Sequence, residues 1–197
     1  MATPILYIGN KNYSSWSLRP WLALKWGGIA FEERIIPLGG EGYGKSKIKD
    51  VLAVSPSGRV PALHLNGAII NDSLAICEWA AEQAPSLWPR DPMARALARS
   101  AAAEMHSGFA ALRNDLSMNI RRRMTSAPKI SDDAHADIAR LFELWIGLRE
   151  TQGAGGAYLF GARSIADAMY APVATRLRTY AIPTPSIVQA YCDTIFA

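Results

Sequence analysis

The sequence predicts two structural units, an α/β N-terminal half followed by an all-helical C-terminal half. Over about the first 80 residues, short apolar runs alternate with stretches whose apolar residues recur at helical spacing. Three prolines then fall within the segment APSLWPRDP, after which only helical spacing is found. We therefore expect domains at residues 1–83 and 93–197, joined by a linker at residues 84–92.

The α/β half begins with a strand, a helix and a second strand. Residues 5–8 form a short apolar run typical of a buried strand, and helical spacing follows over residues 17–26. A Gly-Gly pair ends that helix, residues 31–36 supply the second strand, and residues 45–54 form a short, weakly patterned helical segment. A helix that connects two strands in this way predicts that the strands are parallel.

A hairpin and a helix complete this half. Residues 60–65 and 68–71 are two apolar runs joined by Asn66-Gly67, a dipeptide that predicts a hairpin because a type I′ turn needs positive φ at both positions. Asp72 or Ser73 then caps the next helix. The expected order of elements is β-α-β-α-β-β-α.

The C-terminal half shows helical patterns and no strand signal. Apolar residues mark one face of a long helix over residues 94–116 and of another over residues 134–148. Residues 164–167, Ser-Ile-Ala-Asp, resemble a capping box with Asp in place of Glu at the start of a further helix. Residues 186–196 supply the last helix, so we expect a helical bundle.

Charge gives only a weak indication of the ligand. The formal net charge is +4, which mildly favours acidic ligands but is far from the pattern of a nucleic-acid-binding protein. The densest basic run is Arg121-Arg122-Arg123. We expect it at the end of a helix, where cations suit the helix dipole, or in contact with an anion.

Several other classes of function lack their sequence signals. Two distant cysteines and three scattered histidines predict neither a disulfide framework nor a metal site, and Cys77 is expected to be a small buried hydrophobe. No apolar run is long enough to cross a bilayer and no signal peptide is recognisable, so we expect no membrane partner and a cytoplasmic location. The chain has no P-loop and no G-x-S-x-G motif, so the ligand itself is expected to bring the reactive group.

Three serines lie where the first strand gives way to the first helix. Ser14, Ser15 and Ser17 can cap the helix, or they can donate hydrogen bonds to an anion at the helix N-terminus. Lowering a thiol pKa by two units requires about 2.7 kcal/mol, and one hydrogen bond to a charged group contributes about 1.5–3 kcal/mol. A serine hydroxyl can therefore stabilise the thiolate of a ligand without any protein cysteine.

Two further residue pairs stand at the ends of predicted elements. Val60-Pro61 opens a strand, and the residues alone predict a trans bond, because only about 5% of bonds before proline are cis. Asp72-Ser73 stands at a helix N-terminus, where the pair can cap the helix or hold the ammonium and carboxylate groups of an amino acid.

Four segments, in this order and at this spacing, resemble the glutathione S-transferase family over essentially the whole chain. They are SSWSLR at residues 14–19, RVPAL at 59–63, NDSLAI at 71–76 and SIADA at 164–168. The first is similar to the S-S-C-S-x-R pattern of the zeta class, and the second to the family's cis-proline segment. The resemblance implies a thioredoxin-like N-terminal domain followed by a C-terminal helical bundle.

The resemblance also implies roles for individual residues. Ser14 would donate to the thiolate of glutathione, with Ser15 as the near alternative. Val60 would pair its backbone with the cysteinyl part of glutathione, and Pro61 would be cis. Residues of the third segment would hold the γ-glutamyl end, Ser73 through the carboxylate and Asp72 through the amino group.

The glycyl end of glutathione is less clearly assigned. Arg59 would reach its carboxylate, with Lys45 or Lys47 as weaker candidates. The helical domain would wall a site for a small apolar electrophile. Met105, Phe109 and Leu112 are candidates for that site, although core packing is the simpler expectation for each.

The sequence departs from the family pattern in ways that bear on the chemistry. Trp16 replaces the cysteine of the zeta pattern, which puts in doubt any reaction that uses that thiol. Asp72 is shorter than the usual Glu or Gln. Tyr7 is a further candidate because other classes use a tyrosine near the end of the first strand, but its position within the strand predicts that it is buried.

The resemblance implies an enzyme that conjugates glutathione to small apolar electrophiles and forms a homodimer. The alternatives are a glutathione-dependent isomerase of the maleylacetoacetate isomerase type, a peroxidase, or a non-catalytic binding module of the same fold. No nucleic acid is expected as a partner.

Overall fold

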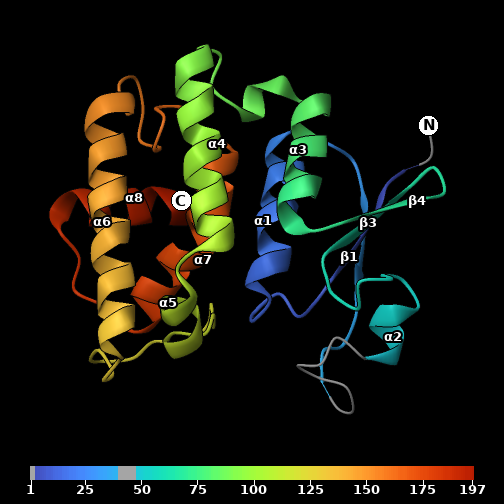
Figure 1. Cartoon of the computed structure of the whole chain (residues 1–197), viewed down its shortest axis with the longest axis horizontal. Helices are drawn as coiled ribbons and strands as arrows, with labels where there is room; N and C mark the ends of the chain where they lie inside the picture. Colours follow the sequence, from blue (N-terminus) through green and yellow to red (C-terminus); the bar gives the residue numbers. More distant parts are fainter. Residues whose placement is uncertain (1–2, 40–47) are drawn as a thin grey trace. The chain divides into compact units, whose positions relative to one another are not determined.

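The computed structural model describes residues 3–39 and 48–197, and the chain divides into two units, Met1–Leu87 and Trp88–Ala197 (Figure 1). The first unit contains all the strands found in the described residues, and the second contains helices. No helix in the described ranges is both long enough and apolar enough to span a membrane.

The N-terminal unit is built on a mixed sheet of four strands. These are β1 (Ile5–Ile8), β2 (Glu32–Ile35), β3 (Ala62–Leu65) and β4 (Ala68–Asn71), in the spatial order β2-β1-β3-β4. Strand β1 is parallel to β2, as the intervening helix predicts, and antiparallel to β3, which in turn pairs antiparallel with β4. The predicted hairpin is confirmed, with Asn66 and Gly67 at φ values of 50° and 80°.

Helices cover this sheet on both faces. Helix α1 (Ser15–Trp26) packs against α3 (Ser73–Gln83), and the short α2 (Lys49–Leu52) precedes β3. Side chains alternate along β1, so Leu6 and Ile8 share one buried face. Tyr7 points to the opposite face, where it packs with Val51 of α2. The predicted order β-α-β-α-β-β-α is therefore confirmed.

The C-terminal unit is the expected helical bundle. Its helices are α4 (Pro92–Ser107), α5 (Ala110–Asp115), α6 (Asp132–Gln152), α7 (Ile165–Thr179) and α8 (Ser186–Phe196). Helix α7 is central, because all its residues except Arg178 are buried and it packs against both α4 and α8. Trp145 of α6 closes the core with edge-on contacts to Tyr170 and Tyr191.

The predicted capping box at the start of α7 is confirmed and is part of a larger network. The carboxylate of Asp167 is fully buried and accepts hydrogen bonds from the backbone N–H and the hydroxyl of Ser164 at 2.8 and 3.0 Å. It also accepts from the N–H of Leu159 at 3.1 Å and the hydroxyl of Tyr191 at 3.0 Å. One carboxylate thus ties the start of α7 to the preceding loop and to α8.

The prediction of a single long helix over residues 94–116 is wrong. The helix stops at Ser107, and Phe109 adopts a left-handed conformation with φ of 57° before α5 begins. Apolar spacing continues across this break, which is why the pattern gave no sign of it. Two side chains stabilise the break, since Asp137 accepts from the N–H of Leu112 at 2.9 Å and Arg113 donates to the carbonyl of Gly108.

The prediction that Arg121-Arg122-Arg123 ends a helix is also wrong. These residues lie in an irregular segment between α5 and α6. Arg123 donates to the backbone carbonyls of Ile120 and Arg122 at 2.6 and 2.7 Å, and the N–H of Arg122 donates to Asn119 at 3.2 Å. Local side-chain bonds to the backbone therefore replace helical ones in this segment.

Candidate functional site

The strand register brings three of the predicted site segments to one edge of the sheet. Ala62 of β3 pairs with Tyr7 of β1 on one side and with Asn71 of β4 on the other. Because both neighbours run antiparallel to β3, the residues before Ala62 lie beside those that follow Tyr7 and Asn71. Val60-Pro61 is therefore flanked by the loop that leads to Ser14 and by Asp72-Ser73.

Val60 presents its backbone at the centre of this edge. The Val60-Pro61 bond is cis, as the family resemblance implies and contrary to the expectation from the residues alone. Outside the ladder, the N–H and C=O of Val60 form no backbone hydrogen bond with another described residue. An extended peptide can pair with such groups in the manner of an added strand.

The loop before Val60 is held in place from both sides. The hydroxyl of Ser55, which is fully buried, donates to the side-chain oxygen of Asn71 at 2.8 Å. The ring of His64 is hydrogen-bonded to the carbonyl of Val54 at 2.6 Å. These contacts fix the approach to Val60 relative to β3 and β4.

Ser73 is the first residue of α3 and places a buried hydroxyl at its N-terminus. Only 1% of Ser73 is exposed, and its Oγ has no hydrogen-bond partner in the described part of the chain. Asp72 caps the helix, with its Oδ1 accepting from the N–H groups of Leu74 and Ala75 at 2.7 and 3.3 Å. A buried hydroxyl without a partner is costly, so this position suits a ligand that provides an acceptor.

Asp72 is held in an uncommon conformation for a residue other than glycine. Its φ is 81°, and its side chain is exposed apart from the capping bonds. Such conformations cost about 1–3 kcal/mol and concentrate at functional sites. One carboxylate oxygen of Asp72 thus accepts hydrogen bonds from the first turn of α3, while the residue is exposed to solvent.

The serines of the first loop form a chain of hydrogen bonds rather than a set of caps. Ser14 is the N-cap residue of α1, but its hydroxyl does not cap the helix. Instead its Oγ donates to the Oγ of Ser17 at 2.8 Å, and that oxygen also accepts from the N–H of Gly9 at 3.1 Å. The interpretation that these hydroxyls only cap the helix is therefore wrong for Ser14.

Exposure separates the three serines. Ser15 and Ser17 are 7% and 3% exposed, whereas Ser14 is only half-buried. Ser14 therefore has the open side that a ligand needs. The sequence analysis considered Ser17 as a cap or an anion donor but assigned the thiolate only to Ser14 or Ser15, although the position of Ser17 three residues after Ser14 places both hydroxyls on one face of the helix.

Glycine leaves room at the point where this loop leaves β1. A Cβ added to Gly9 would lie 3.1 Å from the Cβ of Ser14 and would also collide with Leu38. The absence of a side chain therefore allows Ser14 to approach β1 closely. This approach is what lets the N–H of Gly9 reach Ser17.

Trp16 packs over Arg19 at the position where the zeta pattern has a cysteine. Its ring lies 4.3 Å from the guanidinium carbon of Arg19, which is fully buried in α1. An aromatic face stabilises a cation in this geometry. A cysteine has no comparable surface, so the substitution of the zeta pattern changes how Arg19 is covered.

The side chains of two other candidates, Tyr7 and Cys77, are buried. Tyr7 is buried as predicted, and its hydroxyl accepts from Arg34 at 3.2 Å on the side of β2. Cys77 is fully buried, and desolvation raises the pKa of its thiol far above the ordinary value.

The remaining candidates are those for the glycyl end of glutathione and those for the electrophile site. Arg59 is exposed next to Val60, whereas Lys45 and Lys47 lie outside the described residues. In the C-terminal unit, Met105, Phe109 and Leu112 are buried in the core, as the simpler expectation held.

Comparisons with known proteins agree with this geometry. Residues 13–83 match the family described as glutathione S-transferase, N-terminal domain. A crystal structure of a glutathione transferase homologue from Burkholderia with bound glutathione is 25% identical, with a TM-score of 0.74, and covers 100% of this chain and 92% of its own. The fold is also shared by the Tau class glutathione S-transferase of mango, which is 18% identical with a TM-score of 0.72. That match covers 99% of this chain and 89% of the mango chain.

Relatives by sequence carry more specific names. A probable maleylacetoacetate isomerase of Caenorhabditis elegans is 36% identical over 113 residues, or 56% of this chain and 50% of that protein. The chain thus matches about half the length of this relative. A maleylpyruvate isomerase of a Ralstonia species is 28% identical over 201 residues, which cover 95% of this chain and 93% of that protein.

Proposed function

Because the chain belongs to the glutathione S-transferase family, we propose that it binds glutathione along this edge of the sheet and directs the thiolate at small apolar electrophiles. The product would be a thioether conjugate, which makes the protein a glutathione transferase. The protein would act as a homodimer, the usual assembly implied by the resemblance.

The buried hydroxyl of Ser73 is the observation that carries this proposal. It is 1% exposed and without a hydrogen-bond partner in the described residues, at the N-terminus of an 11-residue helix. The γ-glutamyl carboxylate of glutathione supplies the missing acceptor, and the positive end of the helix dipole favours its charge. The exposed Asp72 is placed to accept from the neighbouring ammonium group.

The centre of the tripeptide would lie against Val60. Its N–H and C=O, which form no backbone hydrogen bond outside the ladder with another described residue, can pair with the cysteinyl residue of glutathione. This pairing fixes the sulfur relative to the start of α1. Arg59, exposed beside Val60, would meet the glycyl carboxylate. The segments at 59–63 and 71–76 would thus hold the three residues of the tripeptide between them.

Ser14 would activate the thiol with the support of Ser17. A hydroxyl can donate one hydrogen bond and accept two, so Ser17 can turn its proton towards Ser14 while it continues to accept from Gly9. The proton of Ser14 is then free to point at the sulfur. The resulting chain runs from the Gly9 N–H through Ser17 and Ser14 to the thiolate, and each bond polarises the next.

Replacement of Ser73 by alanine tests the binding site directly. Ser73→Ala removes a hydrogen bond to a charged group, worth about 1.5–3 kcal/mol, so the Kd for glutathione should rise roughly 10- to 100-fold. Isothermal titration measures this change. The matched control is Ser107→Ala, which removes an exposed hydroxyl bonded only to the carbonyl of Ala103 within α4 and should leave the Kd unchanged.

Two results would contradict the proposed site. The first is unchanged glutathione affinity in a folded Ser73→Ala variant. The second is an unmodified protein that neither binds glutathione at millimolar concentration nor is stabilised by it against thermal unfolding. The second result would favour a binding module without transferase activity.

A glutathione-dependent isomerase is the second candidate, and the names of the relatives favour it. Relatives from Caenorhabditis elegans, rat and Pseudomonas aeruginosa are named maleylacetoacetate isomerases. Attack of the thiolate on an electrophilic carbon is common to both candidates. A transferase releases the conjugate, whereas an isomerase adds the thiolate to a carbon–carbon double bond and expels it again after bond rotation. The consumption of glutathione distinguishes them, because conjugation consumes one thiol per turnover and isomerisation of maleylpyruvate consumes none.

A further inference from the structure

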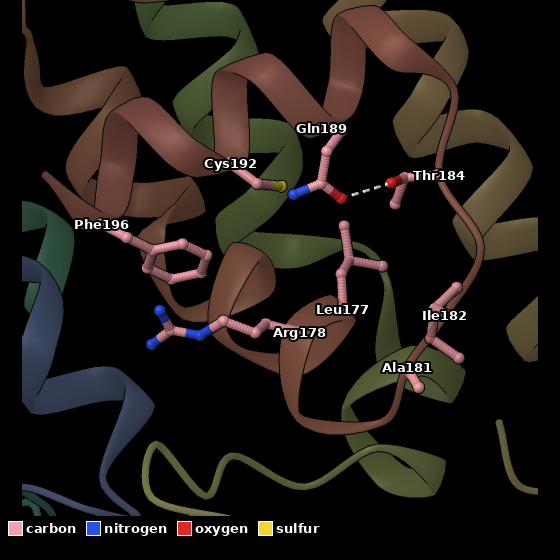
Figure 2. Close-up of a pocket in the computed structure, with 8 residues that line it drawn as sticks. All are labelled: Leu177, Arg178, Ala181, Ile182, Thr184, Gln189, Cys192 and Phe196. Carbon is pink, nitrogen blue, oxygen red and sulfur yellow. Dashed lines mark hydrogen bonds between the residues drawn. The ribbon is translucent and has the colours of Figure 1, made fainter. Parts of the chain in front are cut away.

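The C-terminal unit contains a cavity of about 230 Å³ between the end of α7 and α8 (Figure 2). Its walls combine apolar side chains, among them Leu177, Ile182 and Phe196, with the polar side chains of Arg178, Thr184 and Gln189. The volume falls below the range of about 300–1,000 Å³ that is typical of sites for drug-sized ligands. The cavity therefore suits a smaller molecule with an apolar body.

Arg178 is the only charged residue that lines this cavity, whose lining residues all belong to the described part of the chain. It is also the only residue of α7 that is not buried. Figure 2 shows its guanidinium group against the ring of Phe196, and the distance from the guanidinium carbon to the ring centroid is 3.4 Å. The Nε of Arg178 is buried and has no hydrogen-bond partner among the described residues.

The negative charge of Asp193 stabilises the protonated guanidinium of Arg178 only in part, since the pKa of Arg178 stays below its ordinary value. The carboxylate of Asp193 accepts from Gln189 at 2.8 Å, and the amide oxygen of Gln189 accepts from Thr184 at 2.9 Å. Desolvation lowers the pKa of Arg178, and the positive charge of Arg123 lowers it further. Arg123, which has no role in the proposed function, thus adds to the positive potential at Arg178, while Asp193 reduces it.

We propose that this cavity binds a small monocarboxylate with an apolar body, and that Arg178 is its counter-ion. The planar guanidinium fork matches a carboxylate and can form two parallel hydrogen bonds with it. The body of the ligand would lie against Leu177 and Ile182. A single negative charge is expected because Arg178 is the one charged residue among those that line the cavity.

Titration with benzoate tests this proposal, with benzyl alcohol as the uncharged analogue. Benzoate should bind the full-length protein at millimolar concentration, and benzyl alcohol should bind at least roughly 10-fold more weakly, because a hydrogen bond to a charged group contributes about 1.5–3 kcal/mol. Arg178→Gln should weaken benzoate to the same extent. Saturating glutathione should not displace benzoate, which separates this cavity from the site in the N-terminal unit.

Two variants keep the test independent of folding. Ile182→Phe fills the cavity without changing charge and should also weaken benzoate, while Arg163→Gln, at an exposed position of the same unit, should not. Circular dichroism of each variant checks its fold. The proposal is wrong if benzoate does not bind, if benzyl alcohol binds equally well, if glutathione displaces benzoate, or if both Arg178→Gln and Ile182→Phe retain full affinity.

Discussion

Replacement of Ser14 by alanine should lower turnover with chlorodinitrobenzene by roughly 100- to 1,000-fold, the usual cost of removing one donor to a developing or resident anion in an active site. The affinity for glutathione should change far less, because the γ-glutamyl end is held at Ser73 and the cysteinyl end at Val60. Steady-state kinetics and isothermal titration of the same preparation measure the two effects separately.

Neighbouring variants identify the hydroxyl that matters. Ser17→Ala should give a smaller loss, because it removes only the support for Ser14, and Ser17→Thr should recover most of the activity by restoring a hydroxyl. Tyr7→Phe should retain activity, since the Tyr7 hydroxyl bonds to Arg34 on the side of β2. Full activity in Ser14→Ala together with loss in Ser15→Ala or Tyr7→Phe would contradict the assignment.

Replacement of Asp167 by alanine should destabilise the protein by at least about 3 kcal/mol. The buried carboxylate accepts four hydrogen bonds, and each buried donor left without an acceptor costs about 1–3 kcal/mol. Burial raises the pKa of the Asp167 carboxyl above its ordinary value, although the hydrogen bonds lower it in part. The alanine variant no longer bears this cost of burying a charge, which offsets part of the lost stability. Urea denaturation followed by circular dichroism measures the change.

Asp133 provides the matched control for this experiment. It lies in the first turn of α6, as Asp167 lies in the first turn of α7, but it is exposed. Asp133→Ala removes only a favourable charge at a helix N-terminus, which is worth about 0.3–1 kcal/mol. Equal denaturation midpoints for the two variants would show that the Asp167 network does not stabilise the fold.

The sequence predicts most of the fold of the N-terminal unit because its signals are local. Asn66-Gly67 fixes the hairpin, and the hairpin fixes the register that places Val60 beside Ser73. The break between α4 and α5 has no such signal. Phe109 keeps the apolar spacing of a continuous helix, and the break depends on Asp137, which is distant in sequence.

In the candidate site, too, some features can be predicted from neighbouring residues, whereas others depend on tertiary packing. The positions of Ser14, Val60 and Ser73 at the ends of elements can be predicted from their neighbours. The burial of Ser73 and the bond between Ser14 and Ser17 depend on the packing of the unit, so the residues alone left capping as an equal interpretation. The role of Trp16 as a cover for the buried Arg19 likewise becomes visible only in the structure.

The most direct test of the central claim is the pKa of the thiol of bound glutathione, followed by thiolate absorbance across pH. If Ser14 stabilises the thiolate, that pKa should lie about two units below the ordinary thiol value of about 8.5 in the unmodified protein. It should return towards 8.5 in Ser14→Ala. A bound thiol that titrates near its ordinary value, or a lowered pKa that survives the loss of the Ser14 hydroxyl, would contradict the account.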